Sequence, residues 1–196
     1  MAFDLMAEEM RPAAEITGAK PKHRLPRRIA LAGSTSSGKT TLGRRLSSIT
    51  GAPHIELDAL FHGPNWTPNE DFRERVAEAT SGEAWITDGN YAAARDLTWA
   101  RADLIVWLDY GLPRILWRLT ERTFRRWWKR EVLWNGNREV LRNHFFSKDS
   151  LYLWALQTHR RHRREYPRHF AAYDGARVVR IRSPRELERW LASVSA

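Results

Sequence analysis

The chain has 196 residues, a length typical of one domain, and its 42% hydrophobic residues, ten tryptophans among them, supply enough apolar surface for a full core. The absence of cysteine excludes disulfides and thiolate metal sites, and the formal net charge of +10 suits nucleotides, nucleic acids and acidic membranes alike. Since no apolar run approaches the roughly 18 residues of a membrane span, we expect a cytoplasmic protein without a membrane partner.

The chain begins with a segment that lacks the pattern of a buried element. Residues 1–26 mix charged residues with Pro12, Pro21 and Pro26, and no apolar period runs long enough to bury a face. We therefore predict a flexible N-terminal extension over residues 1–26 and a single domain over residues 27–196.

The segment Gly33–Thr40 carries the G-x-x-x-x-G-K-[ST] phosphate-binding loop, or P-loop, between a strand predicted at 29–32 and a helix predicted at 39–49. Its glycines let backbone N–H groups wrap a β-phosphate, Lys39 adds a positive charge, and the Thr40 hydroxyl suits Mg²⁺. These features predict ATP and Mg²⁺ as cofactors. The predicted nucleotide contacts are Gly33, Ser34, Thr35, Ser36, Ser37, Gly38, Lys39, Thr40 and Thr41.

An acidic residue, Asp58, follows the strand predicted at 54–57, and Phe61 and Trp66 come soon after it. Because ligands bind at the carboxyl ends of strands in open parallel sheets, Asp58 is a candidate to orient or deprotonate an acceptor hydroxyl. The alternative is that Asp58 caps a short helix and that the aromatic residues belong to the core. A further helix is predicted at 69–80.

Mg²⁺ beside a phosphate loop is usually held by a carboxylate at the end of a neighbouring strand. Asp88 closes the strand predicted at 85–87, and Asp109 closes the strand predicted at 104–108. The longer apolar run favours Asp109, but the glycine after Asp88 permits a tight turn above the phosphates. We select Asp88 as the metal ligand beside Thr40; for either aspartate the alternative is a helix N-cap.

An arginine ridge follows on a helix predicted from Leu112 to Glu131. The i, i+4 spacing of its arginines on a helix of 3.6 residues per turn produces a slanted row that is suited to phosphates, although a solvated basic face is the alternative. The ridge consists of Arg114, Arg118, Arg122, Arg126 and Arg130. The residues expected to pack inward are Ile115, Leu116, Leu119 and Trp127.

A turn at 134–139, which is a candidate hinge, separates this helix from another that begins near Ser150 and carries the basic stretch 159–164. The stretch is too dense in charge for one nucleotide, so we expect it to join an electropositive lid or to contact nucleic-acid phosphates. Its histidines lack acidic or cysteine partners at ligand spacing, which argues against a metal other than Mg²⁺.

The last elements are a strand predicted at 178–181 and a helix with Ser183 as N-cap, Pro184 at its first position and Glu186 at its third. Strand and helix candidates alternate along the whole domain. This alternation predicts a three-layer α/β/α sandwich around a parallel sheet.

The ordered motifs resemble those of adenylate-kinase-like P-loop proteins of the type labelled DNA topology modulation protein, over about residues 27–192. The specific matches are Asp88-Gly89-Asn90-Tyr91 and the segment Asn135-Gly136-Asn137-Arg138-Glu139. The resemblance implies a five-stranded sheet of order 2-3-1-4-5, a P-loop beside the strand that ends at Asp88, and an arginine-rich lid over about 112–166. Adenylate kinases carry a Phe-Pro-Arg run where this chain has Asn90-Tyr91-Ala92, which argues against AMP as the acceptor.

The sequence therefore predicts an ATP-dependent phosphotransferase with an unidentified small acceptor. Asp58 is expected to face the acceptor, and the arginines expected to neutralise the transferring phosphoryl group are Arg118, Arg122, Arg126 and Arg138. The alternative is an ATP-dependent regulator that binds nucleic acid through its basic helices.

Overall fold

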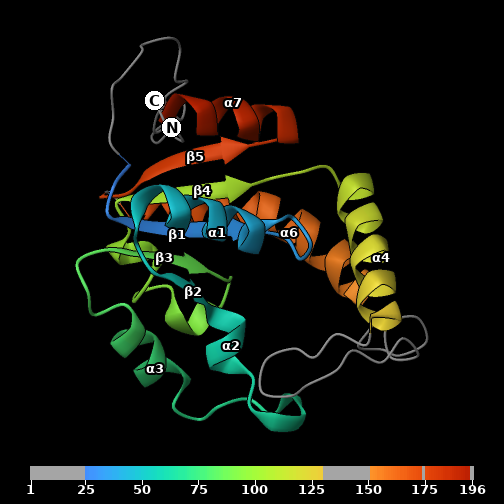
Figure 1. Ribbon diagram of the computed structural model, residues 1–196, viewed down its shortest axis with the longest axis horizontal. Helices are drawn as coiled ribbons and strands as arrows, with labels where there is room; N and C mark the ends of the chain where they lie inside the picture. Colours follow the sequence, from blue (N-terminus) through green and yellow to red (C-terminus); the bar gives the residue numbers. More distant parts are fainter. Residues whose placement is uncertain (1–24, 130–150, 174, 195–196) are drawn as a thin grey trace, which may run out of the picture.

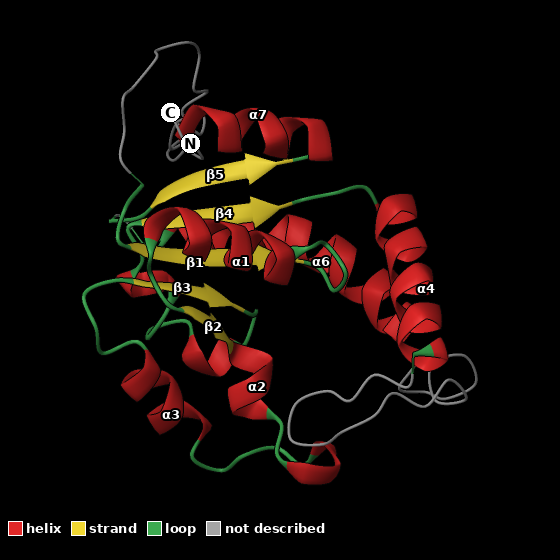
Figure 2. Cartoon of the chain, viewed as in Figure 1, coloured by secondary structure: helices red, strands yellow, loops and turns green. Residues whose placement is uncertain are grey.

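The computed structural model describes residues 25–129, 151–173 and 175–194, and the centre of this part is a five-stranded parallel sheet of order β2-β3-β1-β4-β5. All its strands run in the same direction in Figure 2. The strands are β1 Arg28–Gly33, β2 His54–Glu56, β3 Trp85–Asp88, β4 Leu104–Leu108 and β5 Arg177–Ile181. The predicted fold class, including the strand order, is confirmed.

Helices connect the strands and form the outer layers. The α-helices are α1 Lys39–Thr50, α2 Leu57–Phe61, α3 Phe72–Ala79, α4 Leu112–Trp128, α6 Leu151–Ala171 and α7 Pro184–Val194. Short 3-10 helices are η1 Pro64–Trp66, η2 Ala92–Ala94 and η3 Trp99–Arg101. None of the helices in the described ranges is both long enough and apolar enough to cross a membrane.

The core is divided by the sheet into two apolar layers, as the alternation along β1 illustrates. Ile29 and Leu31 pack with residues of α1 and α7, whereas Ala30 and Ala32 face α6. Figure 1 shows α1 in front of the sheet and α6 behind it. All these β1 side chains are fully buried, as expected for a central parallel strand that is covered on both faces.

Because the strands are parallel, their carboxyl ends meet at one edge of the sheet. In the register of the sheet, Leu31 of β1 pairs with Asp88 of β3, and Gly33 pairs with Leu108 of β4. The P-loop after β1 therefore lies between the residues that end β3 and β4. This edge is where open parallel sheets bind ligands.

Several predicted boundaries differ from the structure; the helix predicted to reach Glu131, for example, ends at Trp128. β2 ends at Glu56, and Leu57 already begins the short helix α2. The helix predicted to begin at residue 69 begins at Phe72, because Asn69 is tied back to α2: its backbone N–H donates to Phe61 O at 2.8 Å and its side chain to Leu60 O at 2.7 Å.

The start of α7 agrees with its predicted capping signal. The Ser183 hydroxyl accepts from the Glu186 N–H at 3.2 Å, and the Glu186 carboxylate accepts from the Arg182 N–H at 2.7 Å. These two bonds occupy donors that a helix start leaves unpaired.

Candidate active site

The P-loop has the conformation that its glycines were expected to allow. Gly33 has φ +149° and Gly38 has φ +99°, both values that favour glycine. A Cβ atom on Gly33 would lie 2.7 Å from the Leu108 carbonyl oxygen, so no side chain fits there. Gly38 precedes α1 and accepts the first helical bond from Leu42 N–H at 3.0 Å, which directs the N-terminus of α1 at the loop.

Lys39 curls back over the loop that precedes it. Its Nζ donates to the carbonyl oxygens of Gly33 at 3.1 Å and Ser34 at 3.3 Å. The side-chain oxygens of Ser36 and Ser37 are buried without a hydrogen-bond partner in the described part of the chain. Buried hydroxyls without partners are costly, so this loop is suited to receive a polar ligand.

Thr40 and Asp88, the two predicted Mg²⁺ ligands, are in direct contact. The Thr40 hydroxyl donates to Asp88 Oδ2 at 2.5 Å, joining the start of α1 to the end of β3. Across the described ranges, no three His, Cys, Asp or Glu side chains cluster as a metal cage would require. One carboxylate with one hydroxyl nevertheless fits Mg²⁺, which keeps several waters and binds proteins through one or two carboxylates together with substrate phosphates.

The Asp88 carboxyl is buried, and its neighbours shift its pKa in opposite directions. Burial raises the pKa of its carboxyl above the ordinary value, against the lowering effects of Lys39 and of the Thr40 hydroxyl. His54 Nε2 lies 3.9 Å from Asp88 Oδ2, and burial lowers the pKa of this histidine. His54 packs against α1 at Gly43, where a Cβ atom would lie only 2.2 Å from the ring.

The residues that follow Asp88 also face the site. Gly89 has φ +155°, and a Cβ atom there would lie 2.7 Å from Leu57 Cβ, so the turn needs glycine. The Asn90 side chain hydrogen-bonds with both backbone polar groups of Gly33. The Tyr91 hydroxyl donates to Asp58 Oδ1 at 2.7 Å.

Asp58 lies in the first turn of α2 beside an aromatic cluster. The centroid of the Tyr91 ring lies 4.6 Å from that of Phe61 and 5.0 Å from that of Phe72. The short helix of the alternative interpretation exists, but its N-cap is Glu56 rather than Asp58. Trp66 is 38% exposed and has φ +60°, so the view of it as an ordinary core residue was wrong.

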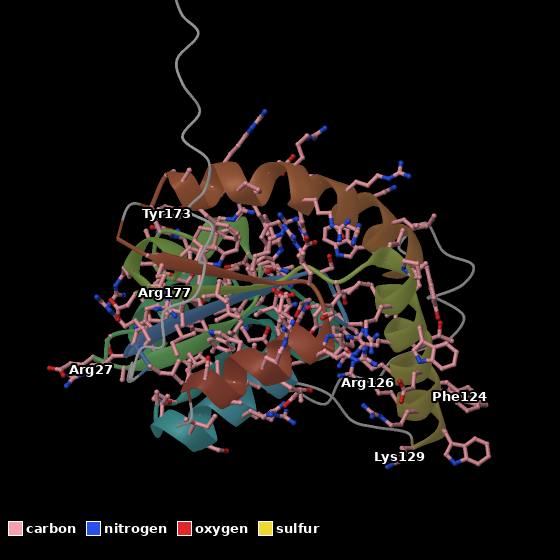
Figure 3. The ribbon with its side chains drawn as sticks, turned by 90° about the horizontal axis from the view of Figure 1, so that it is seen from above. Arg27, Phe124, Arg126, Lys129, Tyr173 and Arg177 are labelled. Carbon is pink, nitrogen blue, oxygen red and sulfur yellow. The ribbon has the colours of Figure 1, made fainter. Side chains whose placement is uncertain are left out.

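The arginines of α4 do not share one environment. Arg118, Arg122 and Arg126 are half-buried, whereas Arg114 and Arg125 are exposed. Arg118 Nη1 donates to Ser37 O at 3.2 Å and therefore reaches the P-loop. In Figure 3, Arg126 points from α4 toward the body of the protein, while Phe124 projects away from it.

The predicted inward face of α4 needs one correction. Ile115 and Leu119 are fully buried and Leu116 packs against the core, but Trp127 is 47% exposed. Trp127 stands eight residues after Leu119, and at 100° per residue this places it about 80° around the helix from Leu119. Arg130, Arg138 and the turn at 134–139 lie outside the described residues, as do residues 1–24.

A pocket of about 620 Å³ lies between α4 and the start of α7. Arg118 lines this pocket and also contacts the P-loop, so the two are adjacent. The other lining residues are Arg114, Trp117, Glu121 and Pro184.

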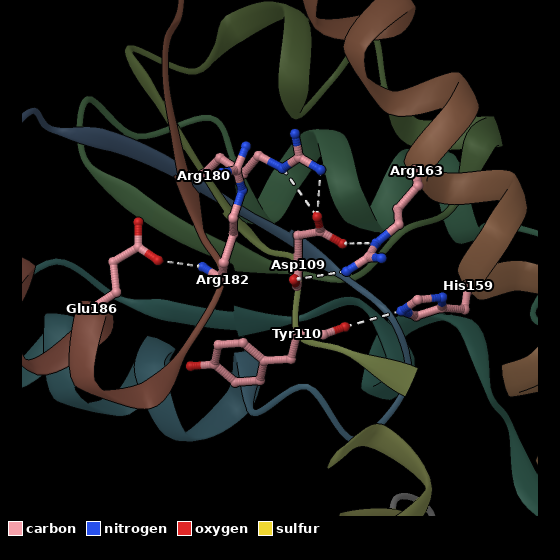
Figure 4. Close-up of polar contacts among 7 residues, drawn as sticks. All are labelled: Asp109, Tyr110, His159, Arg163, Arg180, Arg182 and Glu186. Carbon is pink, nitrogen blue, oxygen red and sulfur yellow. Dashed lines mark hydrogen bonds and ion pairs between the residues drawn. The ribbon is translucent and has the colours of Figure 1, made fainter. Parts of the chain in front are cut away.

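Asp109, the other strand-end aspartate, is occupied by two arginines (Figure 4). Arg163 Nε donates to Oδ1 at 2.7 Å, and Arg180 donates to Oδ2 through Nε at 3.0 Å and through Nη2 at 2.5 Å. The Asp109 side chain is only 4% exposed. The carboxylate therefore ties α6 and β5 to the end of β4.

The basic stretch 159–164 was expected on a lid or a nucleic-acid surface, and part of it instead points inward. His159 is 5% exposed and its Nε2 lies 2.9 Å from Tyr110 O, while Arg163 binds Asp109. His162 stacks on Tyr166 at 4.3 Å between ring centroids, and burial together with nearby Arg161 and Lys39 lowers the pKa of His162 to about 4. The helical period turns every third or fourth residue of this stretch toward the sheet.

The structure brings most of the predicted site residues together at one edge of the sheet. Lys39, Thr40, Asp88 and Arg118 meet at the P-loop, and Asp58 is linked to the same region through Tyr91. Thr35 is half-buried in the loop, and Thr41 is exposed on the first turn of α1. Their functional roles stay predictions.

Several residues of the site were not selected from the sequence. Asn90 and Tyr91 were noted only as part of a motif, and Pro184 only as the start of a helix. His54 offered no recognisable signal, because its position beside Asp88 depends on the pairing of β2 with β3.

No family model matches the chain, and no curated protein matches it in sequence. Among solved structures, a gluconokinase from Sinorhizobium meliloti 1021 is similar, with 20% identity, a TM-score of 0.51 and coverage of 88% of this chain and 94% of that one. A shikimate kinase from Acinetobacter baumannii in complex with shikimate has 19% identity, a TM-score of 0.53 and coverage of 86% and 92%. At these identities, the similarity shows the fold alone.

Proposed function

We propose that the protein is an ATP-dependent phosphotransferase that moves the γ-phosphoryl group of ATP to a hydroxyl of a small acceptor. The observation that carries this proposal is the meeting of the P-loop, the Thr40–Asp88 pair and Arg118 at the carboxyl edge of the sheet. Phosphoryl transfer needs positioning and electrostatic stabilisation rather than covalent catalysis by the protein, and these groups supply both.

Each part of the loop has a proposed role. The backbone N–H groups of the loop hold the β- and γ-phosphates, and Lys39 leaves its carbonyl partners to bind them. Thr40 and Asp88 hold Mg²⁺, directly or through water. When bound, the ion neutralises charge that develops between the β- and γ-phosphates.

The half-buried arginines of α4 act on the transferring group. Arg118 already lies over the loop, and Arg122 and Arg126 follow it on the same inward face. We assign these three arginines, together with Arg138, to stabilisation of the charge that develops in the transition state. They belong to a proposed lid region over about residues 112–166. This lid is part of a proposed kinase-like domain that spans residues 27–196.

The pocket beside Arg118 suits the base of the nucleotide. Trp117 and Pro184 offer flat apolar surface, and the guanidinium of Arg114 can stack on an aromatic ring. The volume of about 620 Å³ falls within the ordinary range for ligand pockets.

Asp58 is proposed to face the acceptor hydroxyl, as a hydrogen-bond acceptor or as general base. The similarity to a gluconokinase and a shikimate kinase supports a small acceptor, since both of these proteins are small-molecule kinases by name.

The nucleic-acid regulator is not favoured. Arg118, Arg122 and Arg126 are turned inward and Arg163 is bound to Asp109, so these cations do not form an open phosphate-binding face. The label DNA topology modulation protein finds no support in the comparisons.

The test is a screen of small hydroxyl compounds, with nucleoside monophosphates included, for acceptor-dependent ADP release in the presence of Mg²⁺. The proposal predicts release above background with at least one hydroxyl acceptor and its loss in Asp88→Asn. ADP release that no acceptor stimulates would contradict a phosphotransferase and indicate an ATPase. Nucleic-acid binding with a steep salt dependence and no turnover would favour the regulator.

A further inference from the structure

The Asn90 side chain is paired with the backbone of Gly33, the first residue of the P-loop. Asn90 Oδ1 accepts from the Gly33 N–H at 3.3 Å, and Asn90 Nδ2 donates to the Gly33 carbonyl at 2.5 Å. This double contact requires one orientation of the amide, because its oxygen must meet the N–H and its nitrogen the carbonyl.

The contact continues the sheet beyond the end of β3. The ladder between β1 and β3 ends at the pair Leu31 and Asp88, where the chain turns away at Gly89 with φ +155°. A carboxamide carries the same donor and acceptor as a peptide group. The Asn90 side chain therefore pairs with the backbone of Gly33 where backbone partners from β3 are no longer within reach.

The same short segment holds the other end of the loop as well. Asp88 accepts from the hydroxyl of Thr40, the last residue of the loop, and Asn90 binds the first. Both ends of the segment Gly33–Thr40 are thus fixed to residues 88–90.

The Gly33 carbonyl also receives the Lys39 ammonium at 3.1 Å. Under the proposed function, Lys39 must release this carbonyl to reach a phosphate. Gly33 is buried, and a buried carbonyl left without a donor would oppose that movement. Asn90 Nδ2 remains on the same oxygen, so the carbonyl stays hydrogen-bonded after Lys39 departs.

We propose that Asn90 is a positioning residue for nucleotide binding, which keeps the first residue of the P-loop in its bound conformation and frees Lys39 for the phosphates. This inference rests on the proposed function, because it assumes that the loop binds a nucleoside triphosphate. Asn90 acts through Gly33 and Lys39, and it needs no contact with the nucleotide.

The experiment measures the affinity for the magnesium complex of a non-hydrolysable ATP analogue by calorimetry. Asn90→Ala removes both bonds to Gly33, and we expect affinity to fall about tenfold or more. Asn90→Asp keeps the shape but loses the donor and adds negative charge near the phosphates, so the fall should be larger. The matched control is Asn69→Asp, which loses a comparable side-chain bond to Leu60 O away from the loop and should keep wild-type affinity.

Three further readouts separate positioning from general stability. Amide hydrogen exchange at Gly33 should accelerate in Asn90→Ala, while the melting temperature should fall no more than in Asn69→Asp. In turnover with an acceptor, KM for ATP should rise more than kcat falls.

Wild-type affinity in both Asn90 variants would overturn this inference and leave the proposed function intact. Equal losses in the Asn90 and Asn69 variants would also overturn it, because the effect would then follow stability. Absence of nucleotide binding by the wild-type protein would overturn the proposed function, and this inference with it. If Asn90→Ala does not fold, the comparison of Asn90→Asp with Asn69→Asp decides.

Discussion

The Tyr91 hydroxyl donates a hydrogen bond of 2.7 Å to Asp58 Oδ1, linking the segment after β3 to the first turn of α2. Burial and the Asp58 charge raise the pKa of Tyr91 above its ordinary value, so the hydroxyl remains a donor. Tyr91 follows Asp88 by three residues. One short segment therefore orients both the proposed metal ligand and the proposed acceptor-facing carboxylate.

The acceptor role of Asp58 predicts a selective kinetic defect. Asp58→Asn should lower kcat/KM for the acceptor by about 10²-fold or more, because a general base or charged hydrogen-bond acceptor is lost. Tyr91→Phe should have a smaller effect, since it removes only the group that orients the carboxylate. Nucleotide affinity, measured by calorimetry, should change little in both, and a wild-type kcat/KM in Asp58→Asn would refute the assignment.

The two strand-end aspartates predict opposite phenotypes. Asp88→Asn should retain ATP binding but lose Mg²⁺-dependent turnover by about 10²-fold or more. Asp109→Asn should keep turnover per folded molecule and lose about 2 kcal/mol of unfolding free energy, because it weakens the bonds to Arg163 and Arg180. Kinetics together with urea denaturation of both variants checks this. If Asp109→Asn lost turnover without losing stability, the assignment of the metal ligand would be reversed.

The half-buried arginines of α4 predict a defect in turnover rather than in binding. In Arg122→Ala combined with Arg126→Ala, kcat should fall far more than ATP affinity, since guanidiniums aimed at developing charge act mainly in the transition state. Arg125→Ala is the matched control, because Arg125 lies on the same helix and is exposed.

Because the two residues are four apart, the single variants should be measured beside the double variant. Wild-type kcat in the double variant would eliminate the lid role of these positions. A lower salt slope for DNA binding, with unchanged turnover, would instead support a nucleic-acid surface.

Three half-buried histidines, His54, His162 and His169, predict that stability falls on mild acidification. The pKa of His162 is about 4 in the folded protein, against an ordinary 6.5, and burial also lowers the pKa values of His54 and His169. At a pH between the folded and the ordinary pKa of such a histidine, the unfolded chain binds a proton that the folded protein does not. The free energy of unfolding should therefore decrease as pH falls from about 6.5 toward 4.

Urea denaturation at about pH 7 and at about pH 5 tests this pH dependence of the free energy of unfolding. His162→Gln cannot take up the proton, so its stability should depend less on pH than that of the wild-type protein. An identical pH dependence in the two proteins would show that His162 contributes nothing to it.

The parts of the fold that depend on neighbouring residues were predictable from the sequence. The P-loop, the strand before it and the helix after it lie within one short segment, where apolar period and glycine spacing are informative. The capping residues of α7 are a similar local signal. The strand order, in contrast, came from a family resemblance and not from periodicity.

The features that the sequence did not reveal depend on distant residues. Asp109 looked the better strand-end ligand by its apolar run, and only its contacts with Arg163 and Arg180, 54 and 71 residues away, show a different role. The Asn90 contact with Gly33 spans 57 residues. Residue type alone cannot say which of many arginines or asparagines reaches such a partner.

The central claim is that this P-loop binds MgATP for phosphoryl transfer, and calorimetric titration of MgATP into the wild-type protein and Lys39→Ala tests it most directly. Lys39 is half-exposed at the first position of α1, so its replacement by alanine should leave the melting temperature nearly unchanged. We predict saturable binding with a dissociation constant of about 1 mM or lower in the wild-type protein and its loss in Lys39→Ala. Equal affinity in the two proteins, or no binding by the wild-type protein, would contradict the account.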